Sequence, residues 1–201
     1  MMFNNLRISA WPVIATLLLF AACGTGHAAA GPKPLAQQLT ESDRMSLRQA
    51  AAACTDADAN AFFDVFIQSA AVRRKYSAPK ITFSLETQDS RPLRQSEIPG
   101  SRYRDFPIMM VDYYRKPVRP LRPGDDDEYV EISIYKGPQN QLAVEWTRVH
   151  YDGRSDGGDD LGNAVTLDGK PYDSAGPSDG QLLFRPAGGC WELVSDIRYK
   201  P

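Results

Sequence analysis

The sequence has little excess charge and few residues that bind metals or act as nucleophiles. Its 201 residues contain 23 Lys and Arg against 25 Asp and Glu, with only two histidines and three cysteines. Nucleic acid is not an expected partner, because a chain without excess basic charge lacks strong attraction to phosphates. No Gly-rich phosphate loop occurs, and after the N-terminal Cys23 the chain has only Cys54 and Cys190, with no nearby histidine to complete a metal-ligand set. We therefore expect neither a metal nor a cofactor.

The first 30 residues have the features of an export signal. One basic residue, Arg7, precedes an apolar run over residues 11–22 that is too short for a membrane span of the mature protein. Two processing sites compete: Phe20–Cys23 is similar to a bacterial lipobox that would place a lipid on Cys23, and Ala28–Ala30 fits ordinary signal cleavage. We favour the lipoprotein interpretation, because the Gly, Ala and Pro residues of 24–34 are typical of a flexible tether.

Either processing route takes the mature chain out of the cytosol. We expect it in the periplasm or, anchored in the membrane through a lipidated Cys23, on the periplasmic face of the outer membrane, rather than fully secreted. In an oxidising compartment the two remaining cysteines, Cys54 and Cys190, are expected to form a disulfide. We further expect Trp191, on the other face of its strand, to cover a different surface from the one that the disulfide holds.

Two helices are predicted before Pro79. The stronger one begins at Cys54, with Thr55 as its N-cap and an apolar stripe that faces a core. The stripe consists of Phe62, Phe63, Phe66 and Ile67. A second cap at Ser69 indicates that the helix bends or restarts there. A shorter surface helix over residues 40–53 is expected to precede it.

After Pro79 the apolar residues recur at every second position, which predicts strands. The expected strands cover residues 80–87, 106–114, 128–136, 141–151, 181–186 and 190–199. The loops over 88–102 and 152–180 are long for a compact domain and indicate surface excursions or recognition loops. Helices followed by an antiparallel meander predict a single α+β domain over residues 31–201.

Two segments carry a resemblance to known folds. They are FFDVFIQSAAVRRKY at residues 62–76 and LLFRPAGGCWELVSDI at residues 182–197. With the strands between them, they resemble the cystatin-like or nuclear-transport-factor-two-like (NTF2-like) cone found in exported bacterial proteins of unknown function. The resemblance implies N-terminal helices packed on a curved antiparallel sheet, often with a pocket between them. Members include enzymes, ligand binders and interaction modules, so the fold alone does not choose a function.

A candidate pocket lies on the predicted strand 141–151, where Trp146, Arg148 and His150 alternate along one face. His150 is the only histidine of the folded body, and no Ser or Cys nucleophile motif accompanies it, so we assign no catalytic residue. The three side chains would line a pocket if this face looks into the cone. Under an enzyme hypothesis, His150 would work with a carboxylate as acid and base. The carboxylates considered are Glu145, Glu131 and Asp112.

The acidic loop over residues 152–163 superficially resembles a calcium loop. With Asp152 as the first ligand, Arg154 takes the third ligand position and Asn163 takes the position of the bidentate Glu, which excludes an EF-hand. A weaker calcium site is the alternative, but we interpret the segment as a solvated turn and assign no metal site.

Basic and acidic residues are unevenly distributed along the chain. Residues 73–122 contain 12 basic and 5 acidic residues, whereas residues 123–201 contain 7 and 15. The interpretation that we favour is that the two parts pair across the folded body. The alternative is a basic face that meets an acidic partner, a phosphate-rich lipid surface or an acidic ligand.

Two functions from different classes remain. The one that we favour is a non-catalytic binding or protection module of the bacterial cell envelope, for instance an immunity or inhibitor lipoprotein. Its ligand would be an unidentified protein or small molecule. The long polar loops and the lack of a recognisable catalytic set support this interpretation. The alternative is a protein that binds or converts a small molecule in the cone pocket.

Overall fold

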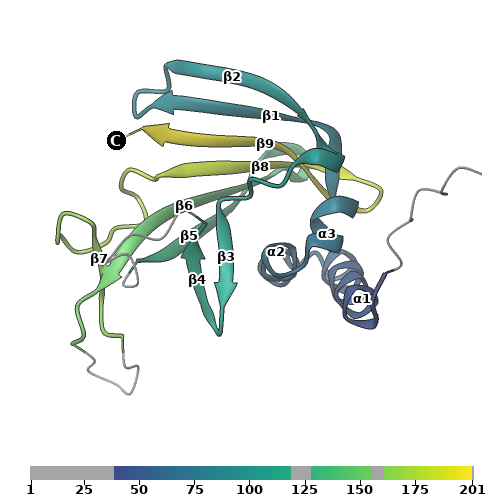
Figure 1. Cartoon of the computed structure of the whole chain (residues 1–201), viewed down its shortest axis with the longest axis horizontal. Coiled ribbons are helices and arrows are strands. Elements are labelled where there is room, and N and C mark those ends of the chain that lie inside the picture. Colours follow the sequence, from purple (N-terminus) through teal and green to yellow (C-terminus); the bar gives the residue numbers. More distant parts are fainter. Residues whose placement is uncertain (1–38, 119–127, 155–160, 201) are drawn as a thin grey trace, which may run out of the picture. The chain divides into compact units, whose positions relative to one another are not determined.

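A computed structural model describes residues 39–118, 128–154 and 161–200 of the chain (Figure 1). The predicted export signal, the lipidation candidate Cys23 and the acidic residues at 125–127, 156, 159 and 160 lie outside these ranges. Among the described residues, no helix combines the length and the apolar character needed to cross a bilayer. The expected lipidation and localisation therefore stay predictions.

Three helices open the described chain: α1 (Glu41–Thr55), α2 (Ala59–Gln68) and α3 (Ala70–Lys75). α1 begins with a capping box, in which the side chains of Thr40 and Asp43 each accept from the other's backbone N–H. Most of its side chains are exposed, as expected of a surface helix. Ser69 ends α2 and caps α3, and its hydroxyl accepts from the N–H of Val72 at 3.3 Å. Of the two alternatives predicted for Ser69, a bend or a restart, the structure shows a restart.

The stronger helix does not begin at Cys54. Cys54 and Thr55 are the last residues of α1, and the Thr55 hydroxyl donates to the Ala51 carbonyl at 3.0 Å. The N-cap of α2 is Asp58, whose carboxylate accepts from the N–H of Ala61 at 3.0 Å. The prediction of Thr55 as the N-cap is wrong because the alanine-rich run before Cys54 favours helix and extends α1 past it. Asp58 then supplies an equally good cap.

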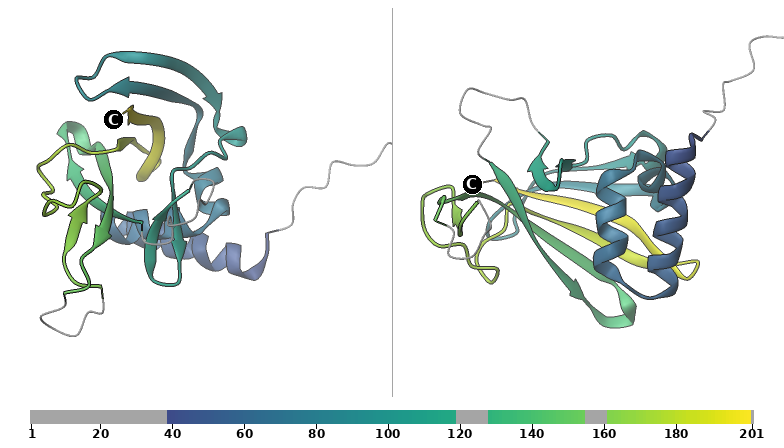
Figure 2. Two further views of the ribbon diagram at one scale, coloured as in Figure 1. Left: turned by 60° about the vertical axis from the view of Figure 1, so that its left-hand side comes forward. Right: turned by 90° about the horizontal axis from the view of Figure 1, so that it is seen from below.

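Seven strands of the described chain form one curved sheet: β1 (Ser77–Thr87), β2 (Pro92–Pro99), β5 (Tyr129–Lys136), β6 (Leu142–Tyr151), β7 (Ala164–Thr166), β8 (Gly180–Ala187) and β9 (Cys190–Lys200). Six follow the order β2-β1-β9-β8-β6-β5, and β7 pairs with β6. β3 (Ile108–Val111) and β4 (Tyr114–Pro117) form a separate hairpin. The helices lie on the concave side of the sheet, at one end of its strands (Figure 2).

The segment predicted as one strand over residues 106–114 is part of a hairpin. It turns at Asp112 and Tyr113, so that β3 and β4 pair antiparallel. Asp112 has a φ of 55°, a left-handed conformation that Asp tolerates better than most residues. Apolar and aromatic residues occur on both sides of the turn, so the sequence pattern resembles that of one continuous strand. The predicted loop 88–102, in turn, contains β2, whose mostly exposed side chains give no apolar alternation.

The expectation of a wholly antiparallel sheet is wrong at one pair, because β1 and β9 run parallel. Both strands start at the helical end of the sheet: β1 directly follows α3, and β9 begins at Cys190, which is bonded to Cys54 at the end of α1 (Figure 1). Strands that leave the same end run in the same direction. The predicted class is otherwise confirmed: an α+β fold with N-terminal helices packed on a curved sheet and one disulfide.

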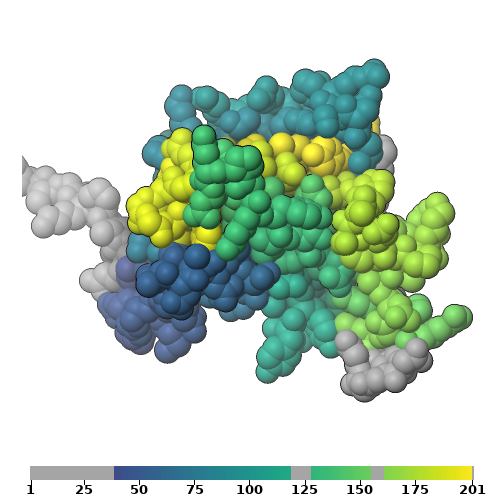
Figure 3. Space-filling model, turned by 180° about the vertical axis from the view of Figure 1, so that it is seen from behind, coloured from purple at the N-terminus to yellow at the C-terminus, as the bar shows by residue number. Residues whose placement is uncertain are grey.

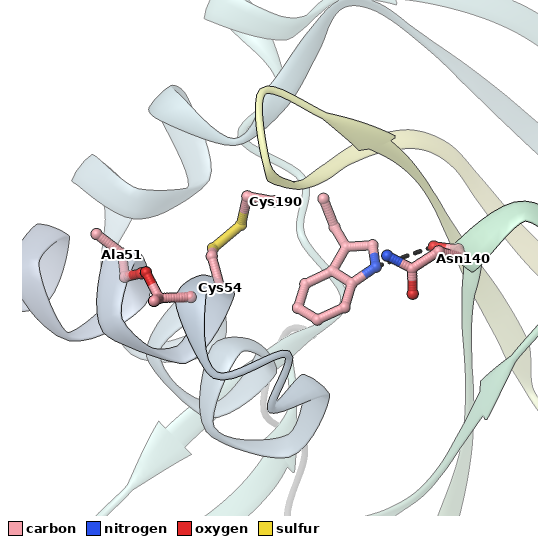
Figure 4. The surroundings of a disulfide bond; sticks show 6 residues. Ala51, Cys54, Asn140 and Cys190 are labelled. Carbon is pink, nitrogen blue, oxygen red and sulfur yellow. Dashed lines mark hydrogen bonds between the residues drawn. A yellow bond between two sulfur atoms is a disulfide. The ribbon is translucent and has the colours of Figure 1, made fainter.

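The disulfide between Cys54 and Cys190 joins residues 136 apart in the sequence (Figure 4). Trp191 belongs to the same apolar core as Cys190, with its ring 5.4 Å from that of Phe62 and its Nε1–H donating to the Asn140 carbonyl at 3.1 Å. The expectation that Trp191 covers a separate surface is therefore wrong. α1 contacts Cys190 through the disulfide, and α2 contacts Trp191 through Phe62. The two consecutive residues of β9 therefore both belong to the core.

Aromatic side chains of α2 form the centre of the core. Phe62, Phe63 and Phe66 are fully buried, and each ring lies 5.2–6.1 Å from that of Phe184 on β8. The Phe66 ring also lies 5.5 Å from that of Phe106. On the face shown in Figure 3, α1 and α2 lie directly against the C-terminal strands. The predicted apolar stripe therefore faces the sheet, and its orientation is confirmed.

Candidate functional site

Trp146, the first residue of the predicted pocket row, belongs to the core. It is only 7% exposed, and it pairs across the sheet with Gly180 of β8. A Cβ at position 180 would lie 2.6 Å from the indole nitrogen, so the close packing of the two residues requires glycine. Within the described ranges, the indole N–H has no hydrogen-bond partner. Trp146 therefore fills core space between β6 and β8.

Arg148 clamps β6 to the segment that leads into β8. Its Nη2 donates to Asp179 Oδ1 at 2.7 Å, and its backbone N–H donates to the other carboxylate oxygen at 2.7 Å. The Asp179 N–H donates to the Trp146 carbonyl at 2.9 Å. The hydrogen bond to Asp179 raises the pKa of Arg148, whereas partial burial opposes this. The guanidinium therefore has a structural partner.

His150 is half-buried near the end of β6. Glu145 is five residues away on the same strand, and Glu131 is registered opposite Thr147 on β5, so both carboxylates lie on the other face of the sheet. The proposed acid–base pairing of His150 with Glu145 or Glu131 is therefore wrong. Asp112, the third carboxylate considered, lies in the turn between β3 and β4. The structure thus places the predicted row on one strand face, and the pocket that it would line stays a prediction.

A buried polar cluster lies beside this face, and the sequence did not indicate it. Asp196 of β9 is fully buried and accepts from the Tyr103 hydroxyl at 2.8 Å and from Nη2 of Arg198 at 2.9 Å. Arg198 also forms an ion pair with Asp105 at 3.4 Å. Burial raises the pKa of Asp196 although Arg198 and Tyr103 act in the opposite direction, and burial also raises the pKa of Tyr103. These contacts tie the segment before β3 to β9.

An open cavity of about 590 Å³ lies between the end of α2, α3 and β3. This volume is typical of small-molecule sites. The apolar part of its lining includes Ile67, Phe106, Ile108, Met109 and Met110. Its charged part consists of Arg73, Arg104 and Asp112. Because the lining residues are spread over helices, a strand and loops between positions 67 and 118, no local motif in the sequence marks the cavity.

The β3–β4 hairpin and Val118, the residue directly after it, expose several large apolar side chains next to the cavity. We call them the hairpin surface; they are Met109, Val111, Tyr113, Tyr114 and Val118. Tyr113, at the turn, is 93% exposed. Three of them, Met109, Tyr113 and Val118, also line the cavity. The hairpin surface and the cavity are therefore continuous.

In the part of the chain that the structure describes, no group of three or more His, Cys, Asp or Glu side chains is arranged to hold a metal ion. In the described part of the acidic loop, Asp152 Oδ1 accepts from the backbone N–H groups of Arg154 and Asn163, both at 2.9 Å. These hydrogen bonds lower the pKa of Asp152. The Asp152 carboxylate therefore links the two ends of the loop.

Comparison with known proteins finds similarity among solved structures. No protein-family model matches the chain, and no curated protein matches it. Among solved structures, an NTF2-like protein of unknown function from Shewanella baltica is similar, with 11% sequence identity and a TM-score of 0.27. The match covers 79% of this chain and 91% of that chain. At this TM-score the similarity supports no argument about function.

Proposed function

We propose that this chain is an exported, non-catalytic binding module of the bacterial cell envelope that binds a partner protein through the hairpin surface. The observation that carries the proposal is the gathering of exposed apolar side chains on one hairpin, with Tyr113 almost fully exposed at its turn. Contiguous exposed apolar groups on a folded domain are typical of interaction sites. Tyr and Met are also enriched in the buried centres of protein interfaces.

The partner is expected to present an apolar face with acidic residues beside it. α3 ends in three basic residues, Arg73, Arg74 and Lys75, and Arg104 lines the cavity next to the hairpin. The stretch 73–122, which contains the hairpin, has 12 basic and 5 acidic residues. Charge complementarity of this kind raises the association rate and selects the partner.

The N-terminal sequence supports the proposed compartment, and the disulfide is compatible with it. Residues 1–30 have the pattern of an export signal, and the bond between Cys54 and Cys190 is compatible with an oxidising compartment. Lipidation at Cys23 would hold the module at the periplasmic face of the outer membrane. For an immunity or inhibitor lipoprotein, the partner would be a toxin or hydrolase that the bound module blocks.

The test is to purify the tagged full-length chain from cells after reversible cross-linking. Val111→Ser changes the hairpin surface without touching the cavity, and Leu93→Ser changes an exposed apolar residue on β2. One envelope protein should co-purify with the wild type and the Leu93 variant, and about tenfold less with the Val111 variant, since loss of a buried valine costs about 1.5 kcal/mol or more.

Two results would overturn the proposal. In the first, no co-purified protein depends on Val111. In the second, Val111→Ser instead abolishes binding to phosphatidylethanolamine and phosphatidylglycerol vesicles, which would make the hairpin surface a membrane contact.

A second candidate function, the binding of a small molecule, is supported by the open cavity beside the hairpin. Its volume of about 590 Å³ and its mixed apolar and charged lining suit a ligand with both characters.

A further inference from the structure

Arg73 is a partly buried cation that forms no ion pair with any residue of the described ranges. Its Nη1 donates to the carbonyls of Phe66 and Ile67 at the end of α2, and its guanidinium lies 5.2 Å from the centre of the Phe106 ring. Burial lowers the pKa of Arg73, and the positive charge of Arg74 acts in the same direction. Because a partly buried charge without a counter-charge is costly, this position favours an anion.

A second arginine lines the same cavity. Arg104 is exposed, and it too forms no ion pair within the described part of the chain. The one carboxylate in the cavity lining given above is Asp112. Two guanidinium groups against one carboxylate leave a net positive cavity, which suits a ligand with a single negative charge better than one with two.

Most of the remaining lining residues are apolar and favour a ligand with an apolar body. Ile67, Phe106 and Ile108 are almost fully buried and provide a rigid apolar floor. Met109 and Met110 form a side of the cavity, and methionine adapts its shape readily to an apolar ligand.

We propose that the cavity between α2, α3 and β3 binds a small molecule in which a carboxylate is attached to an apolar body. The carboxylate lies with Arg73 and Arg104, because a guanidinium donates two parallel hydrogen bonds to a carboxylate. The apolar body lies against Ile108 and the two methionines. This inference rests on the second candidate function, and it does not require the partner protein.

The experiment is isothermal titration of the purified full chain with decanoate as the probe. Decan-1-ol and decyltrimethylammonium have the same chain length with a neutral and a positive head group. We expect saturable binding of decanoate and at least about tenfold weaker binding of the other two, since hydrogen bonds between two charged groups are stronger than those to a neutral hydroxyl. Equal affinity for decanoate and decan-1-ol, or no saturable binding of decanoate, would overturn the proposal.

Arginine variants locate the site. Arg104→Gln should weaken decanoate binding about tenfold or more, whereas Arg74→Gln, an exposed neighbour that does not line the cavity, should leave it unchanged. Arg104 carries the test because Arg73 also binds backbone carbonyls and its loss could impair folding. Wild-type affinity in Arg104→Gln would place decanoate elsewhere and refute the assignment.

The Val111→Ser variant separates the two proposals. It should bind decanoate like the wild type, because Val111 does not line the cavity. Loss of decanoate binding in Val111→Ser would contradict the placement of the ligand in the cavity.

Discussion

Replacing Phe66 by Ala tests the core that positions both the cavity and the hairpin. Phe66 is fully buried on α2, and its ring lies 5.2 Å from that of Phe184 and 5.5 Å from that of Phe106. The same ring contacts Phe62 and Phe63 on its own helix. Truncation therefore removes contacts that join α2 to β8 and to the segment before β3.

The expected loss in the free energy of unfolding is about 3–5 kcal/mol, the range for truncation of a buried phenylalanine that leaves a cavity. Aromatic contacts contribute about 0.5–1.5 kcal/mol each beyond burial and are not additive, so the four ring contacts place Phe66→Ala toward the upper part of this range. A domain of this size has a total stability of about 5–15 kcal/mol. The variant should therefore stay folded but be strongly destabilised.

Urea unfolding of the oxidised protein, followed by tryptophan fluorescence, measures this difference. Met45→Ala on α1 is the control, because Met45 is largely exposed and its truncation should change stability by less than about 0.5 kcal/mol. The denaturant dependence of the free energy should be similar in all three proteins. A loss below about 1 kcal/mol in Phe66→Ala would refute the assignment of this residue to a packed core.

Three further predictions concern the disulfide, the buried carboxylate and the lipid anchor. Cys190→Ser should lower the free energy of unfolding by up to about 5 kcal/mol, because the bond to Cys54 closes a long loop in the unfolded chain. Urea unfolding measures this loss. Non-reducing mass spectrometry of the wild type should find the peptides of Cys54 and Cys190 linked. Burial raises the pKa of Asp196 in the folded protein above its ordinary value of 3.8. The folded state therefore binds this proton more tightly than the unfolded state does. The free energy of unfolding should fall as the pH rises from 3.8 through the folded-state pKa of Asp196. Unfolding curves across pH should show this loss in the wild type and in Asp105→Asn, but not in Asp196→Asn. Fatty-acid labelling in cells should mark the wild type at Cys23 and leave Cys23→Ala unlabelled.

Each of these predictions has an outcome that contradicts it. Two free thiols titrated in the native protein would show that Cys54 and Cys190 are not bonded to each other. The same pH dependence in the wild type and in Asp196→Asn would mean that another group titrates. An unlabelled wild type would favour ordinary cleavage after Ala30.

Features of the fold with a strong local or chemical signal were predictable from the sequence. The apolar stripe of α2 repeats with the helical period, so its core-facing side could be read directly. The pairing of Cys54 with Cys190 followed from parity and compartment. The start of α2 was not predictable in the same way, because Thr55 and Asp58 are both good caps and the choice depends on how far α1 extends.

Features that depend on contacts between distant segments could not be read from the sequence. β2 is a polar strand at the edge of the sheet, and it is extended because it pairs with β1. Asp196 and Arg198 are two apart on one strand and so share a face, but Tyr103, 93 residues before Asp196, completes their cluster only in the folded chain. The cavity likewise forms only when β3 folds against α2 and α3.

The most direct test of the proposed function is site-specific photo-cross-linking in living cells. A photoreactive amino acid at position 113, at the tip of the hairpin, is compared with the same group at position 93 on β2, which is also exposed. The proposal predicts a discrete adduct with one envelope protein from position 113 and none from position 93. No protein adduct from position 113, or the same adducts from both positions, would contradict the claim that the hairpin surface binds a partner protein.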